Sequence, residues 1–221
     1  MPARARKGLS PSAKAQWAQT YEKTAYHALP WFSRRPYPWV ATAVREKWWI
    51  PGSRILDIGC GAGTNSLFLA RAGFKVTGID VADGAIAAAR QRAEKAGLSV
   101  DFRVGDALDL SFPEGHFGGA IDIGCFHTLP LELRPAYAKE IGRVIHARRA
   151  FALSWVAREH RAELGPPHRP SVEEVAAALE EEFLLQRVEY WPSASGRQSQ
   201  GAMPVYFARL GRRSFPRPPA R

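Results

Sequence analysis

The sequence contains little sulfur and no long apolar segment. Its 221 residues include two cysteines, Cys60 and Cys125, which are too few for the disulfide framework of a small secreted protein. No apolar run reaches the roughly 18 residues that a membrane-spanning helix needs. The basic N-terminal stretch from Met1 to Lys7 is not followed by the apolar segment of a secretory signal. We therefore expect a cytoplasmic protein that does not associate with a membrane.

Two further absences narrow the kind of site. The histidines show no H-x-x-x-H pair or similar ligand spacing, so we expect no metal site. The apolar run at 118–123 is not followed by Asn/Asp-Pro-Pro-Tyr, an arrangement that holds the exocyclic amine of a nucleic-acid base. The sequence therefore argues against chemistry on a base.

The positive charge of the chain is concentrated at its two ends. The formal net charge is +10, yet no acid precedes Glu22 and none follows Glu189, so the body between them is neutral by count. Basic ends are typical of solubility or of weak attraction to polyanions. A protein that reads nucleic acid normally carries its basic stripe on the folded surface, so we expect no specific nucleic-acid partner.

Helical and extended segments alternate along the body, which predicts an α/β protein. Hydrophobic residues make up 46% of the chain and charged residues 24%, as in an ordinary globular domain. We expect one domain over 54–211, a helical N-terminal arm over 1–53 and a basic disordered tail over 212–221. The expected strands are 54–58, 75–79, 99–104, 118–123, 150–156, 184–191 and 203–210, and the expected helices are 64–72, 83–96, 131–146 and 171–182.

This alternation predicts a mostly parallel sheet with right-handed crossovers. The last two strands have no helix between them and are joined by a loop rich in proline, serine and glycine, so they should pair antiparallel. Ser171 and Glu174 form a capping-box pattern at the start of the last helix, and Asp83 is a candidate N-cap. Ser10 could cap a further helix running to about Tyr26.

Tryptophan is concentrated in the N-terminal segment. Five of the seven tryptophans precede Arg54: Trp17, Trp31, Trp39, Trp48 and Trp49. Two interpretations stay open. The segment either packs on the edge of the sheet, or forms a lid over the carboxyl ends of the strands, where open α/β sheets bind ligands.

Three elements in order predict a nucleoside site. Gly59, Gly61 and Gly63 follow the first strand and precede a helix, so bare backbone can approach a ligand closely. Asp80 ends the second strand, where an acid accepts both hydroxyls of a ribose. Asp106 follows the third strand and is placed to accept from an adenine amino group. The G-x-G-x-G spacing disfavours a dinucleotide, and two acids suit a ligand without phosphate, such as S-adenosylmethionine.

On these motifs the chain resembles the class I S-adenosylmethionine-dependent methyltransferases. The resemblance implies a Rossmann-like, doubly wound, seven-stranded sheet whose last strand is antiparallel. Three further segments resemble the bacterial small-molecule enzymes of the thiopurine and tellurite methyltransferase type. The segments that carry the resemblance are Leu56–Gly63, Val76–Asp80, Val104–Asp106 and Phe117–Asp122 for the class, and Leu29–Phe32, Gly63–Leu69 and Asp122–Pro130 for the subgroup.

The resemblance also implies roles for individual residues toward S-adenosylmethionine and its product, S-adenosylhomocysteine. The glycines would pass under the methionine part, and Asp80 would hold the ribose. Trp31 would close over the cofactor. The full implied cofactor set is Trp31, Asp57, Gly59, Cys60, Gly61, Asn65, Asp80, Val81, Asp106, Ala107 and Asp122.

Methyl transfer asks little of the protein, because the sulfonium is already activated and the enzyme mainly aligns the acceptor and excludes water. A base is needed only for an acceptor that arrives protonated. His127 is the candidate base, although it could equally fix its own loop by hydrogen bonding. Arg134 could attract an anionic substrate or be a surface charge. The expected substrate-binding set is Trp31, Phe126, His127 and Arg134.

The function expected from these observations is methyl transfer to a small-molecule acceptor, with a thiol or chalcogen slightly favoured over a hydroxyl or amine. An RNA or protein methyltransferase and a non-catalytic cofactor-binding scaffold remain alternatives. The chain should be a monomer or homodimer. Cys60 and Cys125 each end a strand and could lie close together, either as small core residues or as a disulfide or metalloid-binding pair.

Overall fold

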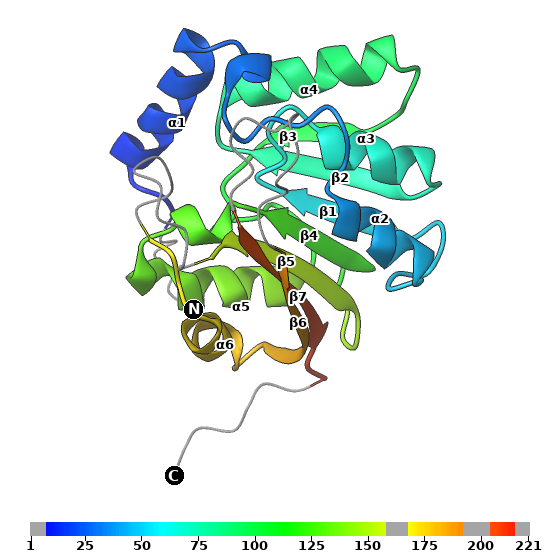
Figure 1. Ribbon diagram of the computed structural model, residues 1–221, viewed down its shortest axis with the longest axis vertical. Helices are drawn as coiled ribbons and strands as arrows, with labels where there is room; N and C mark the ends of the chain where they lie inside the picture. Colours follow the sequence, from blue (N-terminus) through cyan, green and yellow to red (C-terminus); the bar gives the residue numbers. More distant parts are fainter. Residues whose placement is uncertain (1–7, 158–167, 192–203, 215–221) are drawn as a thin grey trace.

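A computed structural model describes residues 8–157, 168–191 and 204–214, which form a seven-stranded sheet with helices on both faces (Figure 1). The strand order is β3-β2-β1-β4-β5-β7-β6. The pairings from β3 to β5 are parallel, whereas β7 runs antiparallel to both of its neighbours, so the predicted topology is confirmed. The strands are β1 (Arg54–Ile58), β2 (Lys75–Asp80), β3 (Asp101–Val104), β4 (Gly119–Ile123), β5 (Ala150–Val156), β6 (Phe183–Trp191) and β7 (Val205–Arg212).

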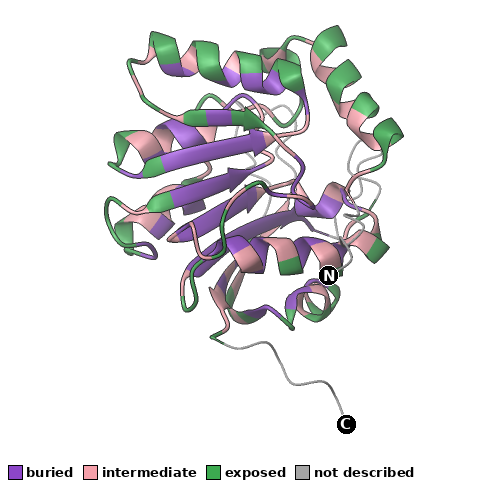
Figure 2. Ribbon diagram, turned by 180° about the vertical axis from the view of Figure 1, so that it is seen from behind, coloured by how far each residue is buried: buried purple, intermediate pink, exposed green. Residues whose placement is uncertain are grey.

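Two apolar layers hold the helices on the sheet. Side chains of α2 and α3 share one buried cluster with one face of the sheet, and α3 and α4 share another beside β3. Those of α5 and α6 pack on the opposite face. Figure 2 shows the buried residues gathered along the strands between these layers. The helices are α1 (Pro11–Lys23), α2 (Pro38–Arg45), α3 (Thr64–Arg71), α4 (Asp83–Lys95), α5 (Arg134–Val144) and α6 (Val172–Leu179).

The starts of two helices differ from the sequence prediction, and one helix is additional. Ala82, not Asp83, is the N-cap of α4, because the Asp80 carboxylate accepts the N–H of Ala82 and the chain turns there. The predicted helix at 131–146 begins as a 3-10 turn and becomes α5 only at Arg134. Helix α2 was not predicted. The capping box of α6 and the Ser10 cap of α1 are both confirmed.

The first residue of the predicted basic tail, Arg212, is part of the sheet instead. Arg212 belongs to β7, where its Nε donates to the carbonyl oxygen of Gly142 at 2.7 Å and its Nη2 lies 3.0 Å from Glu182 Oε2. Arg209 stacks its guanidinium 5.2 Å from the ring centroid of Trp48. Part of the C-terminal charge therefore stabilises the sheet edge. The rest of the predicted tail, 215–221, lies outside the described residues.

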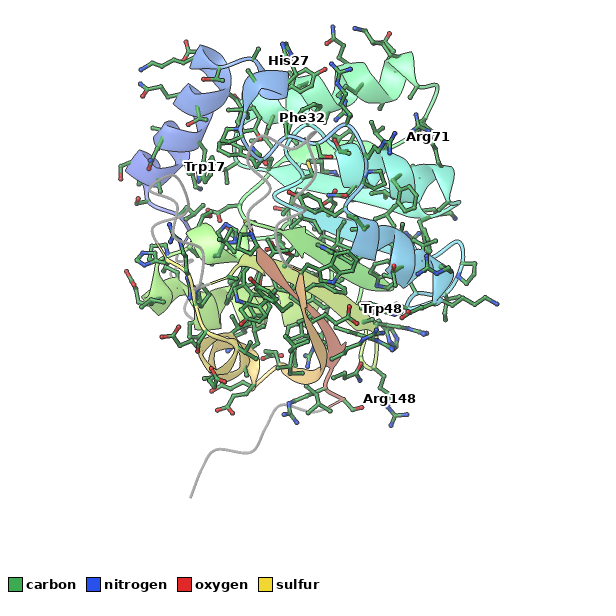
Figure 3. The ribbon with its side chains drawn as sticks, in the orientation of Figure 1. Trp17, His27, Phe32, Trp48, Arg71 and Arg148 are labelled. Atoms are coloured by element: carbon green, nitrogen blue, oxygen red, sulfur yellow. The ribbon has the colours of Figure 1, made fainter. Side chains whose placement is uncertain are left out.

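The N-terminal tryptophans divide into two groups: one packs against the sheet, as the first interpretation has it, and the lid stays a prediction. Trp39 and Trp48 stack on Phe207 of β7 at centroid distances of 4.2 and 5.2 Å, and they are buried together with Trp49. Trp17 and Trp31 lie outside this core. Figure 3 shows the separation, with Trp17 on α1 and Trp48 beyond the far end of α2.

Two predicted absences can be examined within the described residues. No helix there is long and apolar enough to cross a membrane. The same part of the chain contains no group of three or more histidine, cysteine, aspartate or glutamate residues that could hold a metal ion.

The division of the tryptophans predicts that removing a side chain from one group lowers the free energy of unfolding more than removing one from the other. Trp39→Ala removes a fully buried ring and should lower the free energy of unfolding by about 3–5 kcal/mol. Trp31→Ala, at a side chain that is 39% exposed, should change it by no more than about 0.5 kcal/mol. Urea unfolding followed by circular dichroism checks both. Equal losses would contradict this division.

Candidate active site

The candidate site lies at the carboxyl ends of β1, β2 and β4, where the chain after β1 passes over the sheet edge. Gly59 and Gly61 have φ values of +63° and +53°, a left-handed region that favours glycine. The N–H of Cys60 donates to the carbonyl oxygen of Ile79 at 2.9 Å, which fastens this loop to β2. The loop leads directly into α3, as the sequence predicts.

The glycine loop is in close contact with the segment that follows β4. A Cβ atom on Gly59 would lie 2.6 Å from the Cβ of Cys125, which is too short for any side chain there. The two cysteines lie at this junction as free thiols. Burial is the main cause that raises the pKa of each thiol, so both are protonated at neutral pH.

Asp80 joins the glycine loop to the start of α4. Its Oδ2 accepts the N–H of Gly61 at 3.0 Å, and its Oδ1 accepts the N–H of Ala82 at 3.0 Å. The backbone of Val81 also hydrogen-bonds to this carboxylate. Burial raises the pKa of Asp80 against these backbone hydrogen bonds. Asp80 thus lies at the end of β2 and beside the glycine loop, where the sequence predicts an acceptor for ribose hydroxyls.

A tyrosine that the sequence analysis missed covers this point. Tyr21 of α1 places its hydroxyl 3.0 Å from the position that a Cβ on Gly61 would take, and it also packs against Gly84. The indole N–H of Trp31 donates to the Tyr21 hydroxyl at 3.4 Å. Burial and the neighbouring carboxylate of Asp80 raise the pKa of the Tyr21 hydroxyl, which stays protonated. The arm therefore lies over the glycine loop.

The same arm reaches the second predicted acid. Asp106 Oδ2 accepts the backbone N–H of Leu9 at 2.8 Å and forms an ion pair with Lys14 Nζ at 2.8 Å. Its Oδ1 accepts the N–H of Leu108 at 3.0 Å. Within residues 8–157, 168–191 and 204–214, these contacts use three of the roughly four acceptor positions of the carboxylate. These contacts from the arm were not expected.

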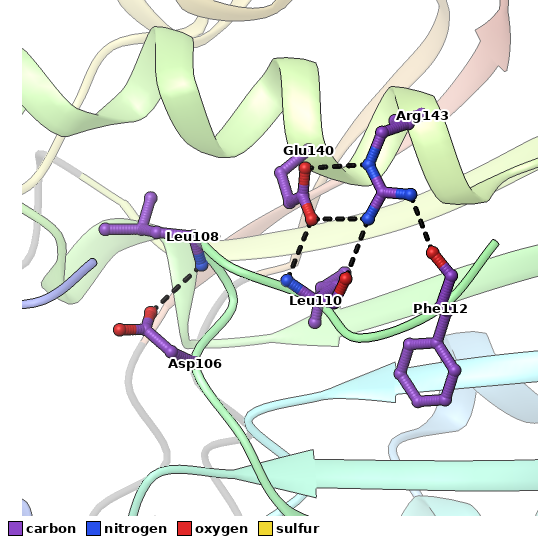
Figure 4. Close-up of polar contacts among 6 residues, drawn as sticks. All are labelled: Asp106, Leu108, Leu110, Phe112, Glu140 and Arg143. Atoms are coloured by element: carbon purple, nitrogen blue, oxygen red, sulfur yellow. Dashed lines mark hydrogen bonds and ion pairs between the residues drawn. The ribbon is translucent and has the colours of Figure 1, made fainter. Parts of the chain in front are cut away.

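A polar network on α5 holds the segment that carries Asp106 (Figure 4). Arg143 donates to the carbonyl oxygens of Leu110 at 2.8 Å and of Phe112 at 2.6 Å, and it pairs with Glu140. Glu140 in turn accepts the N–H of Leu110 at 2.8 Å. The position of Asp106 is therefore fixed in two ways. Helix α5 holds the segment that follows Asp106, and the arm contacts the Asp106 carboxylate directly.

Two predicted cofactor residues, Asp57 and Asp122, accept hydrogen bonds from neighbouring residues of this chain. Asp57 accepts the hydroxyl of Ser66 at 2.5 Å, and burial raises its pKa to about 7. Asp122 accepts the N–H of Cys125 at 2.8 Å and the hydroxyl of Tyr137 at 2.6 Å, and burial likewise raises its pKa to about 7. Both carboxyls are buried. Their visible role is to shape the two loops that meet at the site.

His127 is buried and accepts a hydrogen bond from the backbone. Its Nδ1 lies 3.4 Å from the backbone nitrogen of Val156 at the end of β5, which makes Nδ1 the acceptor. The neutral ring then carries its proton on Nε2 and presents a donor there. Burial, and to a lesser extent the charge of Arg134, lowers the pKa of His127 to about 3. A ring in this state is a poor general base.

The two remaining substrate candidates, Phe126 and Arg134, lie next to His127 and contact each other. Phe126 was expected to contact substrate, but its ring is fully buried in the core below Tyr137, so it supports the site rather than lining it. Arg134 is also buried, so the alternative of a surface charge is wrong. Its guanidinium lies 4.9 Å from the Phe126 ring centroid.

The minor cofactor candidates are distributed around the glycine loop. Asn65 accepts the N–H of Tyr37 at 3.2 Å and ties α3 to the arm. Cys60 turns its sulfur toward the carbonyl of Gly61 at 3.7 Å. Val81 is half-buried, while the side chain of Ala107 is part of the core, so only the backbone of Ala107 is left for a ligand.

The comparisons with known proteins agree with this geometry. Residues 55–148 match the family model described as a methyltransferase domain. The chain is 36% identical over 115 residues to the 2-heptyl-1-hydroxyquinolin-4(1H)-one methyltransferase of Mycobacteroides abscessus, over 52% of this chain and 50% of that protein. It is 33% identical over 131 residues to a ubiquinone biosynthesis O-methyltransferase of Xanthomonas campestris, over 53% and 54% of the two chains. It thus spans about half the length of these curated relatives.

A solved structure extends the likeness of the fold beyond the matched region. A SAM-dependent methyltransferase from Methanosarcina mazei superposes with a TM-score of 0.64 at 24% identity, over 82% of this chain and 99% of that one. Residues 55–148 are therefore similar to a methyltransferase domain, and the sheet has the Rossmann-like fold seen in this methyltransferase.

The protonation state of His127 predicts a pH effect on stability. Between about pH 6 and 4 the unfolded chain binds a proton at His127 that the folded chain does not, so the free energy of unfolding falls as the pH falls. Relative to His127→Gln, the wild type should lose about 1 kcal/mol per pH unit over this window.

Asp57 and Asp122 act in the opposite sense, because their raised pKa values make the folded chain bind more protons between about pH 4 and 7. Both acids are present in wild type and variant, so the difference between the two unfolding curves isolates His127. Parallel curves would show that His127 titrates normally in the folded protein.

Proposed function

We propose that the protein transfers a methyl group from S-adenosylmethionine to a small-molecule acceptor. The observation that carries this proposal is the position of Asp80, whose carboxylate at the end of β2 accepts the N–H groups of Gly61 and Ala82 and so stands beside the glycine loop. Its two oxygens are placed to accept the two hydroxyls of a ribose beside a loop whose backbone favours glycine. The methyltransferase domain match over the same loop supports the choice of nucleoside.

The residues present fit the rest of the cofactor. One acceptor position on Asp106 suits one N–H of an adenine amino group. Tyr21, over Gly61 and beside Asp80, is placed to cover the sugar. Trp31 holds the Tyr21 hydroxyl in place through its indole N–H, on the exposed side of the arm. Lys14 offsets part of the charge of Asp106 and fastens the arm to it.

S-adenosylmethionine supplies a methyl group on a sulfonium, whose sulfur takes the electrons of the broken carbon–sulfur bond while a lone pair of the acceptor forms the new bond. The role of the chain itself is to position the cofactor and the acceptor and to exclude water. Tyr21 of the arm lies over Gly61, and the loop fixed by Asp122 meets the glycine loop at Cys125. His127 offers an N–H at this edge and takes no proton.

The relatives favour an oxygen acceptor. One is described as acting on a hydroxyquinolone and another as an O-methyltransferase, and we propose an acidic hydroxyl of a small ring compound for this chain. The thiol or chalcogen preference drawn from the sequence has no support from these relatives. It stays a prediction that an acceptor screen tests.

A second candidate, RNA methylation, is favoured by a single feature. A surface hollow of about 360 Å³ between α3 and α4 is lined by Arg34, Arg71, Arg92 and Lys95 and by no acid. Release of S-adenosylhomocysteine from S-adenosylmethionine, measured with thiols, phenols, N-hydroxy heterocycles and bulk RNA, separates the two candidates. Turnover with RNA alone would replace the proposal.

Binding of S-adenosylhomocysteine tests the cofactor site itself. Asp80→Asn removes one carboxylate oxygen and places a donor where an acceptor is needed, so the affinity should fall more than tenfold, or about 1.4 kcal/mol. Isothermal titration measures it. Asp83→Asn, an exposed acid three residues further along, is the matched control and should bind as the wild type does. Absence of binding to the wild type would end the proposal.

The arm predicts a rate effect that is separate from affinity. Lys14→Gln breaks the ion pair that fastens α1 to Asp106, so S-adenosylhomocysteine should dissociate several-fold faster. Stopped-flow tryptophan fluorescence follows this, because Trp17 and Trp31 belong to the arm. Lys23→Gln on the same helix, a residue with no ion pair in the described part of the chain, is the control. Equal dissociation rates would mean that the arm does not cover the bound ligand.

A further inference from the structure

Arg134 is a buried cation with few polar partners. Its side chain is 1% exposed, and its Nε has no hydrogen-bond partner. One Nη atom donates to the carbonyl oxygen of His127 at 3.5 Å, which is the limit of a hydrogen bond. The guanidinium otherwise lies over the ring of Phe126, at 4.9 Å from its centroid.

Such a group costs stability unless something pairs with it. A buried charge is normally matched by a counter-charge and by hydrogen bonds to its remaining donors. Glu174 of α6 is close enough to raise the pKa of Arg134 against the effect of burial, but no described carboxylate lies within 4.0 Å of the guanidinium. Arg134 therefore holds donor capacity that the described residues do not use.

Its position relates it to the proposed acceptor site. Arg134 is bound to the carbonyl of His127, two residues after Cys125, whose Cβ lies against Gly59 of the cofactor loop. His127 offers Nε2–H from the same turn, because its Nδ1 accepts from Val156. A cation and a neutral donor thus stand together at the carboxyl end of β4.

We infer that Arg134 and His127 form an anion subsite that receives the acceptor in its ionised form, as the oxyanion of an acidic hydroxyl on a small ring compound. The inference rests on the proposed function and narrows its substrate class. An ionised acceptor already carries the lone pair that it donates, so no side chain has to remove a proton. This accounts for a site in which the acids Asp57 and Asp122 are engaged in the loops and the histidine is a donor.

Binding of a coloured acid tests the proposed anion subsite without any need for turnover. 4-Nitrophenol changes its visible absorption on ionisation, so titration into the protein, with and without saturating S-adenosylhomocysteine, reports both its affinity and its pKa when bound. The wild type should bind the phenolate and lower its pKa. Arg134→Met should bind the phenolate at least tenfold more weakly, and Arg134→Lys should retain part of the affinity.

Lys139→Gln is the matched control, because it removes the same charge from the exposed side of the same helix and should leave phenolate binding unchanged. Thermal unfolding supplies a second readout. Arg134→Met should unfold at the same temperature as the wild type or higher, since it removes an unpaired buried charge, whereas a guanidinium needed for the fold would lower that temperature.

Equal phenolate affinity in wild type and Arg134→Met overturns the inference, as does a wild type that binds only the neutral phenol or neither form. Failure of the proposed function looks different, because S-adenosylhomocysteine would then not bind the wild type, while the phenolate titration in its absence still tests the subsite.

Discussion

The close approach of three backbone segments at Gly59 and Gly61 is the constraint on which the candidate site depends. A side chain at Gly59 would overlap Cys125, and one at Gly61 would press on the Tyr21 hydroxyl. The loops after β1 and β4 and the N-terminal arm therefore meet at one place only because glycine occupies both positions. The acids of the region hold these loops in place: Asp122 fixes the turn after β4, and Asp80 joins the glycine loop to the start of α4.

Charge is distributed along this junction in a consistent order. Asp80 and Asp106 lie at the end that we propose for the nucleoside, and Lys14 offsets part of the charge of Asp106 from the arm. Arg134 stands at the other end with little to neutralise it. A cofactor with a positive sulfonium and an acceptor with a negative oxygen complement the two ends. The arm contributes Lys14 to the first of these ends, where the sheet places the two acids.

The strands and the acids at their ends could be predicted from the sequence, because both follow from local patterns. Apolar runs ending in glycine or aspartate place Gly61, Asp80 and Asp106 on one edge of a parallel sheet. The contacts of Tyr21 and Lys14 could not be predicted, since they join a helix without buried residues to acids far along the chain, and no periodicity encodes such a pairing. The burial of Trp39 depends on Phe207 in the last strand for the same reason.

A crystal structure of the protein with S-adenosylhomocysteine tests the central claim most directly. The account predicts that the two ribose hydroxyls lie within hydrogen-bond distance of the two oxygens of Asp80, with Tyr21 over the sugar and the adenine amino group at Asp106. S-adenosylhomocysteine bound away from the glycine loop, or bound there with its ribose turned from Asp80, would contradict the account.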